Sequence, residues 1–202
     1  MKKDAFAKGV QQIEFRTFYH GSATKIDGDF LEPKEQFNSV QNKRVVGAFV
    51  TSDANDAKFF ALVKCLAGRG QCNLYGKKIF FERISDSIKP EFYLYTVVEK
   101  PDEKFIHDKG TEYYSPTAIK ISKRQVCNTV EEIENFGYEV YVLNEPLKNK
   151  PNKQASDNSH VQSEMRQAII NGAYHRVDVA HLIKQQKSQE KVKIMLEQHE
   201  YE

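Results

Sequence analysis

The sequence predicts an α+β fold with a β-sheet core and a few helices, followed by a helical C-terminal extension. A short apolar run at 45–50 leads directly into a helical pattern with a polar cap. Residues 92–98 combine aromatic and β-branched side chains, which are typical of a strand. The stretch 147–160 is polar, contains a proline and lacks apolar periodicity, so it predicts a linker.

The corner between strand and helix is the clearest local pattern in the chain. Residues 45–50 are mostly β-formers, as in a strand that is covered on both faces. Thr51, Ser52 and Asp53 follow, and their side-chain oxygens are suited to cap the first free N–H groups of a helix. Apolar residues then recur at helical spacing up to the expected stop at Gly68, namely Phe59, Leu62, Val63 and Leu66.

The other expected elements depend on shorter patterns. Pro116 cannot donate to a ladder, so it divides one apolar stretch into two strand pieces. Thr129 is the expected start of a helix whose positive end carries Glu131 and Glu132. In chain order, we expect a strand at 13–19, a loop at 30–43, a strand or helix at 78–84, strands at 111–114 and 118–121, a helix at 130–136 and a strand at 138–143.

Composition divides the chain into a main domain at 1–146, a linker at 147–160 and a helical extension at 161–202. The extension has too few large apolar residues to form a robust domain alone. We expect it to pack on the main domain or on another subunit, or to dock an acceptor or an inhibitory partner such as an antitoxin. Its expected helices cover 161–170, 177–183 and 189–198.

Length and charge limit the class of protein. The 202 residues suffice for one domain with an appendage, and the net charge of +2 disfavours a strongly basic nucleic-acid surface overall. No apolar run approaches the roughly 20 residues of a membrane span. Cys65, Cys72 and Cys127 lack metal-ligand spacing, so we expect reduced thiols, no metal and a cytoplasmic protein.

Several polar and aromatic residues are candidates for chemistry, and each has a structural alternative. His20 at a strand end is more often a hydrogen-bonded structural histidine, and Gly21 is explained by backbone freedom alone. Phe49 and Phe60 are core residues by default. Glu112 beside two tyrosines is equally typical of a strand carboxylate that faces water.

In combination, their order is informative. Tyr19-His20-Gly21-Ser22 ends a strand, Gly47-Ala48-Phe49-Val50-Thr51 precedes a capped helix, and Thr111-Glu112-Tyr113 opens a later strand. This order resembles the three motifs of the ADP-ribosyltransferase superfamily, in particular the branch of poly(ADP-ribose) polymerases and bacterial toxin transferases. The resemblance covers about residues 15–143 and implies that family's split β-sheet core, with 1–146 as an NAD-binding domain.

The resemblance implies roles for individual residues. His20 would bind the adenosine-side ribose of NAD, and the backbone of Gly21 would bind the nicotinamide carboxamide. Phe49 and Phe60 would enclose the cationic pyridinium. Glu112 would be catalytic, because a fixed negative charge stabilises the oxocarbenium-like sugar formed as nicotinamide leaves. Ser22 and Thr51 complete the expected NAD-binding set, and His20 is the second expected catalytic residue.

Two positions depart from the family pattern. Phe49 stands where the family usually has tyrosine, which preserves stacking and removes a hydroxyl group. Gly110 stands two residues before Glu112, where arginine-modifying transferases carry glutamine or glutamate. The resemblance therefore disfavours arginine side chains as acceptors and leaves protein, RNA and DNA open.

Three functions remain open from the sequence. The first is an NAD-dependent ADP-ribosyltransferase, a glycosyltransferase by chemistry, acting as a bacterial or phage toxin or defence effector. The second is an RNA 2′-phosphotransferase of the same superfamily, for which Arg16 and Arg44 are the phosphate-binding candidates near the first two motifs. The third is a non-catalytic module that binds ADP-ribose or a partner.

Overall fold

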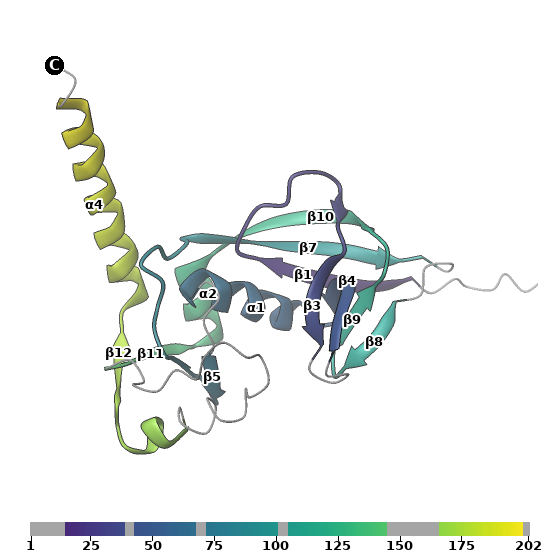
Figure 1. Cartoon of the computed structure of the whole chain (residues 1–202), viewed down its shortest axis with the longest axis horizontal. Coiled ribbons are helices and arrows are strands. Elements are labelled where there is room, and N and C mark those ends of the chain that lie inside the picture. The colour runs from purple at the N-terminus through teal and green to yellow at the C-terminus, as the bar shows by residue number, and fades with distance from the viewer. Residues whose placement is uncertain (1–14, 39–42, 68–71, 101–104, 145–165, 200–202) are drawn as a thin grey trace, which may run out of the picture. The chain divides into compact units, whose positions relative to one another are not determined.

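The computed structural model describes residues 15–38, 43–67, 72–100, 105–144 and 166–199, with 37–38 and 195–199 described by their backbone alone. This part of the chain is a mixed α+β structure with mostly antiparallel sheets, which confirms the predicted α+β class (Figure 1). It forms two compact units. Of the described residues, the first unit contains 15–20, 28–38, 43–54, 95–100 and 105–123, and the second contains the rest.

Four elements pass from one unit to the other along the chain. They are strands β1 (Arg16–Ser22), β7 (Glu91–Glu99) and β10 (Ile119–Asn128), and helix α1 (Ala54–Ala67), of which only Ala54 belongs to the first unit. Both units are consequently assembled from segments that are discontinuous in sequence.

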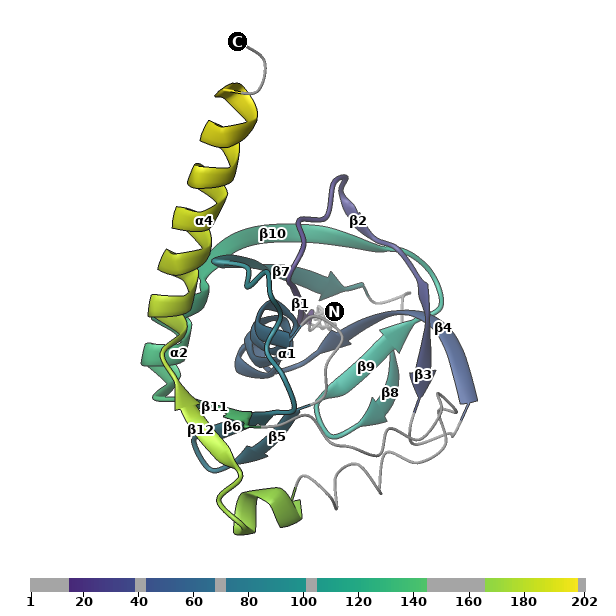
Figure 2. The ribbon, with the colours of Figure 1, turned by 60° about the vertical axis from the view of Figure 1, so that its left-hand side comes forward.

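One sheet provides the framework of the first unit. Its strand order is β2-β10-β7-β1-β4-β9-β8, and β3 also pairs with β4. Figure 2 shows β3, β4, β9 and β8 next to one another. The strands not yet given are β2 (Phe30–Leu31), β3 (Lys34–Asn38), β4 (Lys43–Thr51), β8 (Ile106–Lys109) and β9 (Glu112–Ser115).

The core of the first unit is aromatic. Phe18 is buried, and its ring centroid lies 4.9 Å from the rings of both Phe105 and Tyr113. Tyr95 is completely buried on β7. These rings connect β1 to β9 and to the segment before β8, so the central strands of the unit share one packed face.

A smaller sheet and two helices define the second unit. The sheet order is β12-β11-β6-β5, in which β11 runs parallel to β6 and the other pairs are antiparallel. Leu62, Leu66, Ile79 and Phe81 are fully buried in this unit. The elements are β5 (Cys72–Tyr75), β6 (Lys78–Phe81), α2 (Thr129–Phe136), β11 (Glu139–Leu143), β12 (Tyr174–Val177) and α4 (Val179–His199).

The C-terminal region differs from a wholly helical extension. Residues 166–170 are helical, but β12 follows and pairs with β11 from Tyr174↔Leu143 to Val177↔Val140. The two helices expected at 177–183 and 189–198 are one continuous helix, α4. The predicted linker at 147–160 lies outside the described residues.

The region expected as a loop at 30–43 also contains strand structure. Lys34–Asn38 forms β3, which pairs residue by residue with Lys43–Gly47 of β4. The composition of β3 is mostly polar, so its strand conformation comes from backbone pairing with β4 and not from β-propensity. Helix α2 is capped by Asn128 and not by Thr129, since the Asn128 side chain accepts hydrogen bonds from the N–H groups of Val130 and Glu131.

A buried carboxylate joins three parts of the first unit. Glu99 on β7 is 8% exposed and accepts two hydrogen bonds from the Arg16 guanidinium, at 2.5 and 2.7 Å. Its Oε1 atom also accepts from the backbone N–H of Phe105 at 2.7 Å. Arg16 lies over the rings of Phe18 and Tyr113, and the hydrogen bond with Glu99 raises the pKa of the guanidinium.

We expect Glu99→Gln to lower the free energy of unfolding by about 2 kcal/mol, because it replaces a charge-assisted pair at a buried site with a weaker contact. Urea unfolding measures this change. Glu35→Gln is the matched control, since Glu35 forms the exposed pair with Arg44 and its loss should cost less than about 1 kcal/mol. Equal effects of the two substitutions would contradict a structural role for Glu99.

Candidate functional site

The three predicted motifs lie on three neighbouring strands. The first motif is at the end of β1, the second on β4, and the third at the start of β9, and the sheet order places β4 between the other two. Residues 16–20, 43–51 and 112–115 all belong to the first unit. The fold therefore brings His20, Phe49, Thr51 and Glu112 to the centre of one sheet.

The register defines a row of side chains across these strands. Thr51 pairs with Glu112 on β9 and with Tyr19 on β1. Directly paired residues face the same side of a sheet, so Tyr19, Thr51 and Glu112 share one face. The residue of β1 opposite Thr51 is thus Tyr19 and not His20. Because successive side chains of a strand alternate between its two faces, His20 lies on the face opposite to that of Glu112 in this register. Sequence reasoning did not assign a role to Tyr19.

His20 is held by the backbone of the second motif. Its Nδ1 atom lies 2.8 Å from the carbonyl oxygen of Phe49. A carbonyl oxygen only accepts hydrogen bonds, so Nδ1 carries the proton and Nε2 is the acceptor of the neutral ring. The ring centroid of His20 lies 6.2 Å from that of the buried Tyr95. The orientation of the imidazole is therefore fixed by β4 and β7.

Phe49 stacks on an aromatic residue of β9. Its ring lies 5.5 Å from that of Tyr114, with 29° between the ring planes, and the two residues are register partners. A Cβ atom at Gly47 would lie 2.9 Å from Cδ2 of Tyr114, so the glycine leaves room for this ring. Tyr114 is a second aromatic residue of the site that the sequence analysis did not identify.

The remaining predicted residues of the NAD-binding set lie in the second unit. Phe60 is on α1, where its ring is 42% exposed and lies 6.3 Å from the ring of Phe59. Ser22 donates a hydrogen bond to the carbonyl oxygen of Thr24 and accepts one from its N–H, which is a turn contact. The two aromatic residues expected to enclose the pyridinium thus belong to different units.

Gly21 has a packing role against α1. A Cβ atom at this position would lie 1.8 Å from the carbonyl oxygen of Ala57 and 3.0 Å from Cβ of Ala61. Backbone atoms cannot yield as flexible side chains do, so a glycine is required wherever strand and helix approach so closely.

The backbone conformation of the turn before Glu112 explains why residue 110 is a glycine. Its φ of 53° is left-handed, a conformation that favours glycine. His107 Nε2 contacts the carbonyl oxygen of Gly110 at 3.0 Å, and Ser52 N–H donates to the carbonyl oxygen of Thr111 at 2.9 Å. The absence of glutamine or glutamate at 110 therefore has a backbone cause in addition to any effect on acceptor choice.

The thiols are protonated at neutral pH. Burial raises the pKa of Cys65 and of Cys72 to about 11, and it also raises the pKa of Cys127. All three are free cysteines. Among the described residues there is no group of three or more His, Cys, Asp or Glu side chains placed to hold a metal ion, and no helix long and apolar enough to cross a membrane.

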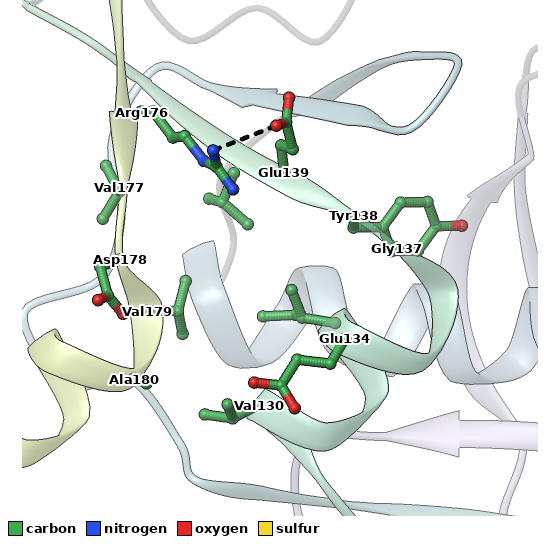
Figure 3. A pocket seen from close by; sticks show the side chains of 12 residues that line it. Val130, Glu134, Gly137, Tyr138, Glu139, Arg176, Val177, Asp178, Val179 and Ala180 are labelled. Carbon is green, nitrogen blue, oxygen red and sulfur yellow. Dashed lines mark ion pairs between the residues drawn. The ribbon is translucent and has the colours of Figure 1, made fainter.

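A separate groove lies within the second unit. It has a volume of about 750 Å³ between α2, β11, β12 and the start of α4 (Figure 3). Aliphatic side chains such as Val130, Val177 and Val179 line it, and Arg176 bonds Glu139 at 3.3 Å on its wall. No motif in the sequence indicated this groove, and none of the predicted site residues lines it.

We expect Gly21→Ala to lower the free energy of unfolding by more than about 3 kcal/mol, because the added methyl group overlaps backbone of α1. Gly110→Ala is the control: its Cβ meets nothing within 4 Å, so only the left-handed φ is penalised, at about 1 kcal/mol. Denaturant unfolding of both variants tests this. Similar losses for both would mean that α1 moves to accommodate a side chain at 21.

No protein-family model matches the chain, no curated protein matches it, and no solved structure matches its fold. The motifs and the geometry described above are therefore the basis for a functional proposal.

Proposed function

We propose that the chain is an NAD-dependent ADP-ribosyltransferase, which cleaves the bond between nicotinamide and ribose and transfers ADP-ribose to a macromolecular acceptor. One observation carries the proposal: three motifs that are about 30 and 60 residues apart in the sequence occupy adjacent strands, with Thr51 paired to Glu112 and His20 bonded to the backbone of Phe49. The proposal includes the split β-sheet fold of the superfamily.

Glu112 supplies the negative charge that the reaction requires. As the bond from nicotinamide to C1′ breaks, its electron pair leaves with nicotinamide and positive charge develops on the ribose. A carboxylate that is already in place stabilises this charge without reorganisation. The acceptor nucleophile then bonds C1′ and loses a proton to solvent. Glu112 is half-buried, and its backbone is held by pairing with Thr51, which supports this role.

His20 and Phe49 are suited to binding. The contact between Nδ1 and the Phe49 carbonyl holds the His20 ring in place, and the proposal assigns a ribose hydroxyl to this imidazole. The half-buried ring of Phe49, stacked on Tyr114, offers an aromatic surface to the pyridinium cation. Thr51 completes the proposed NAD-binding set within the first unit. Gly21, Ser22 and Phe60, which belong to the second unit, stay predictions of the resemblance, and so does a cytoplasmic toxin or defence role.

The phosphotransferase alternative is weaker on structural grounds. Arg16 is bonded to the buried Glu99, and Arg44 is bonded to Glu35 at 2.5 Å. Both arginines that the sequence offered as phosphate ligands thus have carboxylate partners within the first unit, and these partners offset their positive charge and occupy part of their N–H donors.

We expect Glu112→Gln to lower kcat for NAD hydrolysis by roughly 100- to 1,000-fold while NAD affinity changes little, because the lost charge acts mainly in the transition state. Release of labelled nicotinamide measures the rate. Asp108→Asn on β8 is the control, since it removes a carboxylate from the neighbouring strand. A loss below tenfold would move the catalytic role to another residue, and wild-type protein that binds NAD without turnover would favour the binding module.

We expect His20→Ala to weaken NAD binding about tenfold, because it removes one hydrogen bond to the ribose that is remote from the reacting bond. Calorimetric titration with NAD tests this. His107→Ala is the control, since His107 lies in the same unit and contacts the carbonyl oxygen of Gly110 instead. Unchanged affinity in His20→Ala would exclude the histidine from the pocket.

A further inference from the structure

The described part of helix α4 is buried in its first half and exposed further along. The first half packs within its unit through Val179 and Ile183, and Gln186 bonds the backbone of Asp86 and Ile88. From 187 to 194 every residue is exposed. Figures 1 and 2 show α4 running on well past β12 of the same unit. A helix surrounded by solvent for two turns is stabilised by little besides its own backbone.

Lysines form a stripe on this helix. Lys184, Lys187 and Lys191 have the spacing i, i+3 and i+7, which places them on one face over about 10 Å. All three are exposed, and Ile183 and Gln186 mark the face that packs. Helix α4 contains four lysines and two glutamates, so its lysine and glutamate side chains carry a net positive charge.

The stripe is arranged unfavourably for an isolated helix. Lys187 and Lys191 are like charges at i and i+4, which destabilise a helix by a few tenths of a kcal/mol. An anionic partner along this face removes the repulsion. A second copy of α4 is a poorer fit. Glu190 and Lys193 follow Ile183 and Gln186 at heptad spacing, where a coiled coil requires apolar residues. The exposed Val192 and Ile194 are two residues apart and therefore lie on different faces of the helix.

We propose that Lys184, Lys187 and Lys191 form a docking surface for the phosphate backbone of a nucleic acid. A linear array of cations matches a linear array of phosphates, and each contact releases a condensed counterion. We identify the bound nucleic acid with the macromolecular acceptor, so the acceptor would be DNA or RNA. This identification rests on the proposed transferase function. Binding itself does not depend on NAD.

The test is fluorescence anisotropy with the full chain and labelled DNA of about 20 nucleotides, single-stranded and duplex, between about 50 and 200 mM salt. Lys184→Gln/Lys187→Gln/Lys191→Gln should weaken binding at low salt by more than about tenfold. It should also make the slope of log K against log salt shallower by about 2 for the single strand and by somewhat more for the duplex. Lys187→Gln alone should change the single-strand slope by about 0.7.

The matched control is Lys43→Gln/Lys120→Gln/Lys123→Gln, which removes the same charge from exposed positions of the first unit and should leave the slope unchanged. If both triple variants weaken binding equally, the affinity depends only on the net charge of the chain, and the proposal is overturned. A wild-type chain that binds poly-glutamate but neither oligonucleotide would also overturn it. These binding measurements contain no NAD, so the two proposals are tested separately. A chain that hydrolyses NAD but does not bind DNA contradicts only the proposed docking surface. A chain that binds DNA but does not hydrolyse NAD contradicts only the proposed transferase function.

Discussion

Strand β4 lies between β1 and β9, and its antiparallel register fixes which side chains of the first unit share a face. Thr51 pairs with Glu112, Phe49 pairs with Tyr114, and the N–H of Ser52 bonds the turn that precedes β9. Since side chains alternate along a strand, a shift of one residue would turn Glu112 to the opposite face and separate the stacked rings. The carboxylate, its aromatic neighbour and the turn before it thus depend on one ladder.

The elements that the sequence predicted well are those whose apolar pattern is continuous. Strands β4 and β7 each contain a compact run of β-forming residues, and the start of α1 shows apolar residues at helical spacing. All three have a clear polar boundary. Strand β3 was missed because Lys34–Asn38 is polar and acquires its conformation from pairing with β4. The cap of α2 was assigned one residue late, since Thr129 is fully buried and donates to the carbonyl oxygen of Lys89 instead.

The motifs of the candidate site could be predicted from the sequence, but the relative positions of their side chains could not. Sequence order located His20, Phe49 and Glu112, and the sheet places their strands side by side. The pairing of Thr51 with Tyr19 rather than with His20 is a matter of register, which no local pattern determines. Arg16 and Glu99 are 83 positions apart in the sequence, so no local pattern could predict that they form an ion pair.

The discontinuous composition of the two units bears on how the chain acquires its structure during synthesis. The first unit requires residues up to 123, and the second requires α1, β6 and β11 together with β12, which begins at Tyr174. Neither unit is complete in an early nascent chain, and the second becomes complete only after the first, once β12 has been made. Closure of such long loops also predicts slow folding. Any excision or transplantation of one unit into another protein would have to cut the polypeptide at several places and rejoin it.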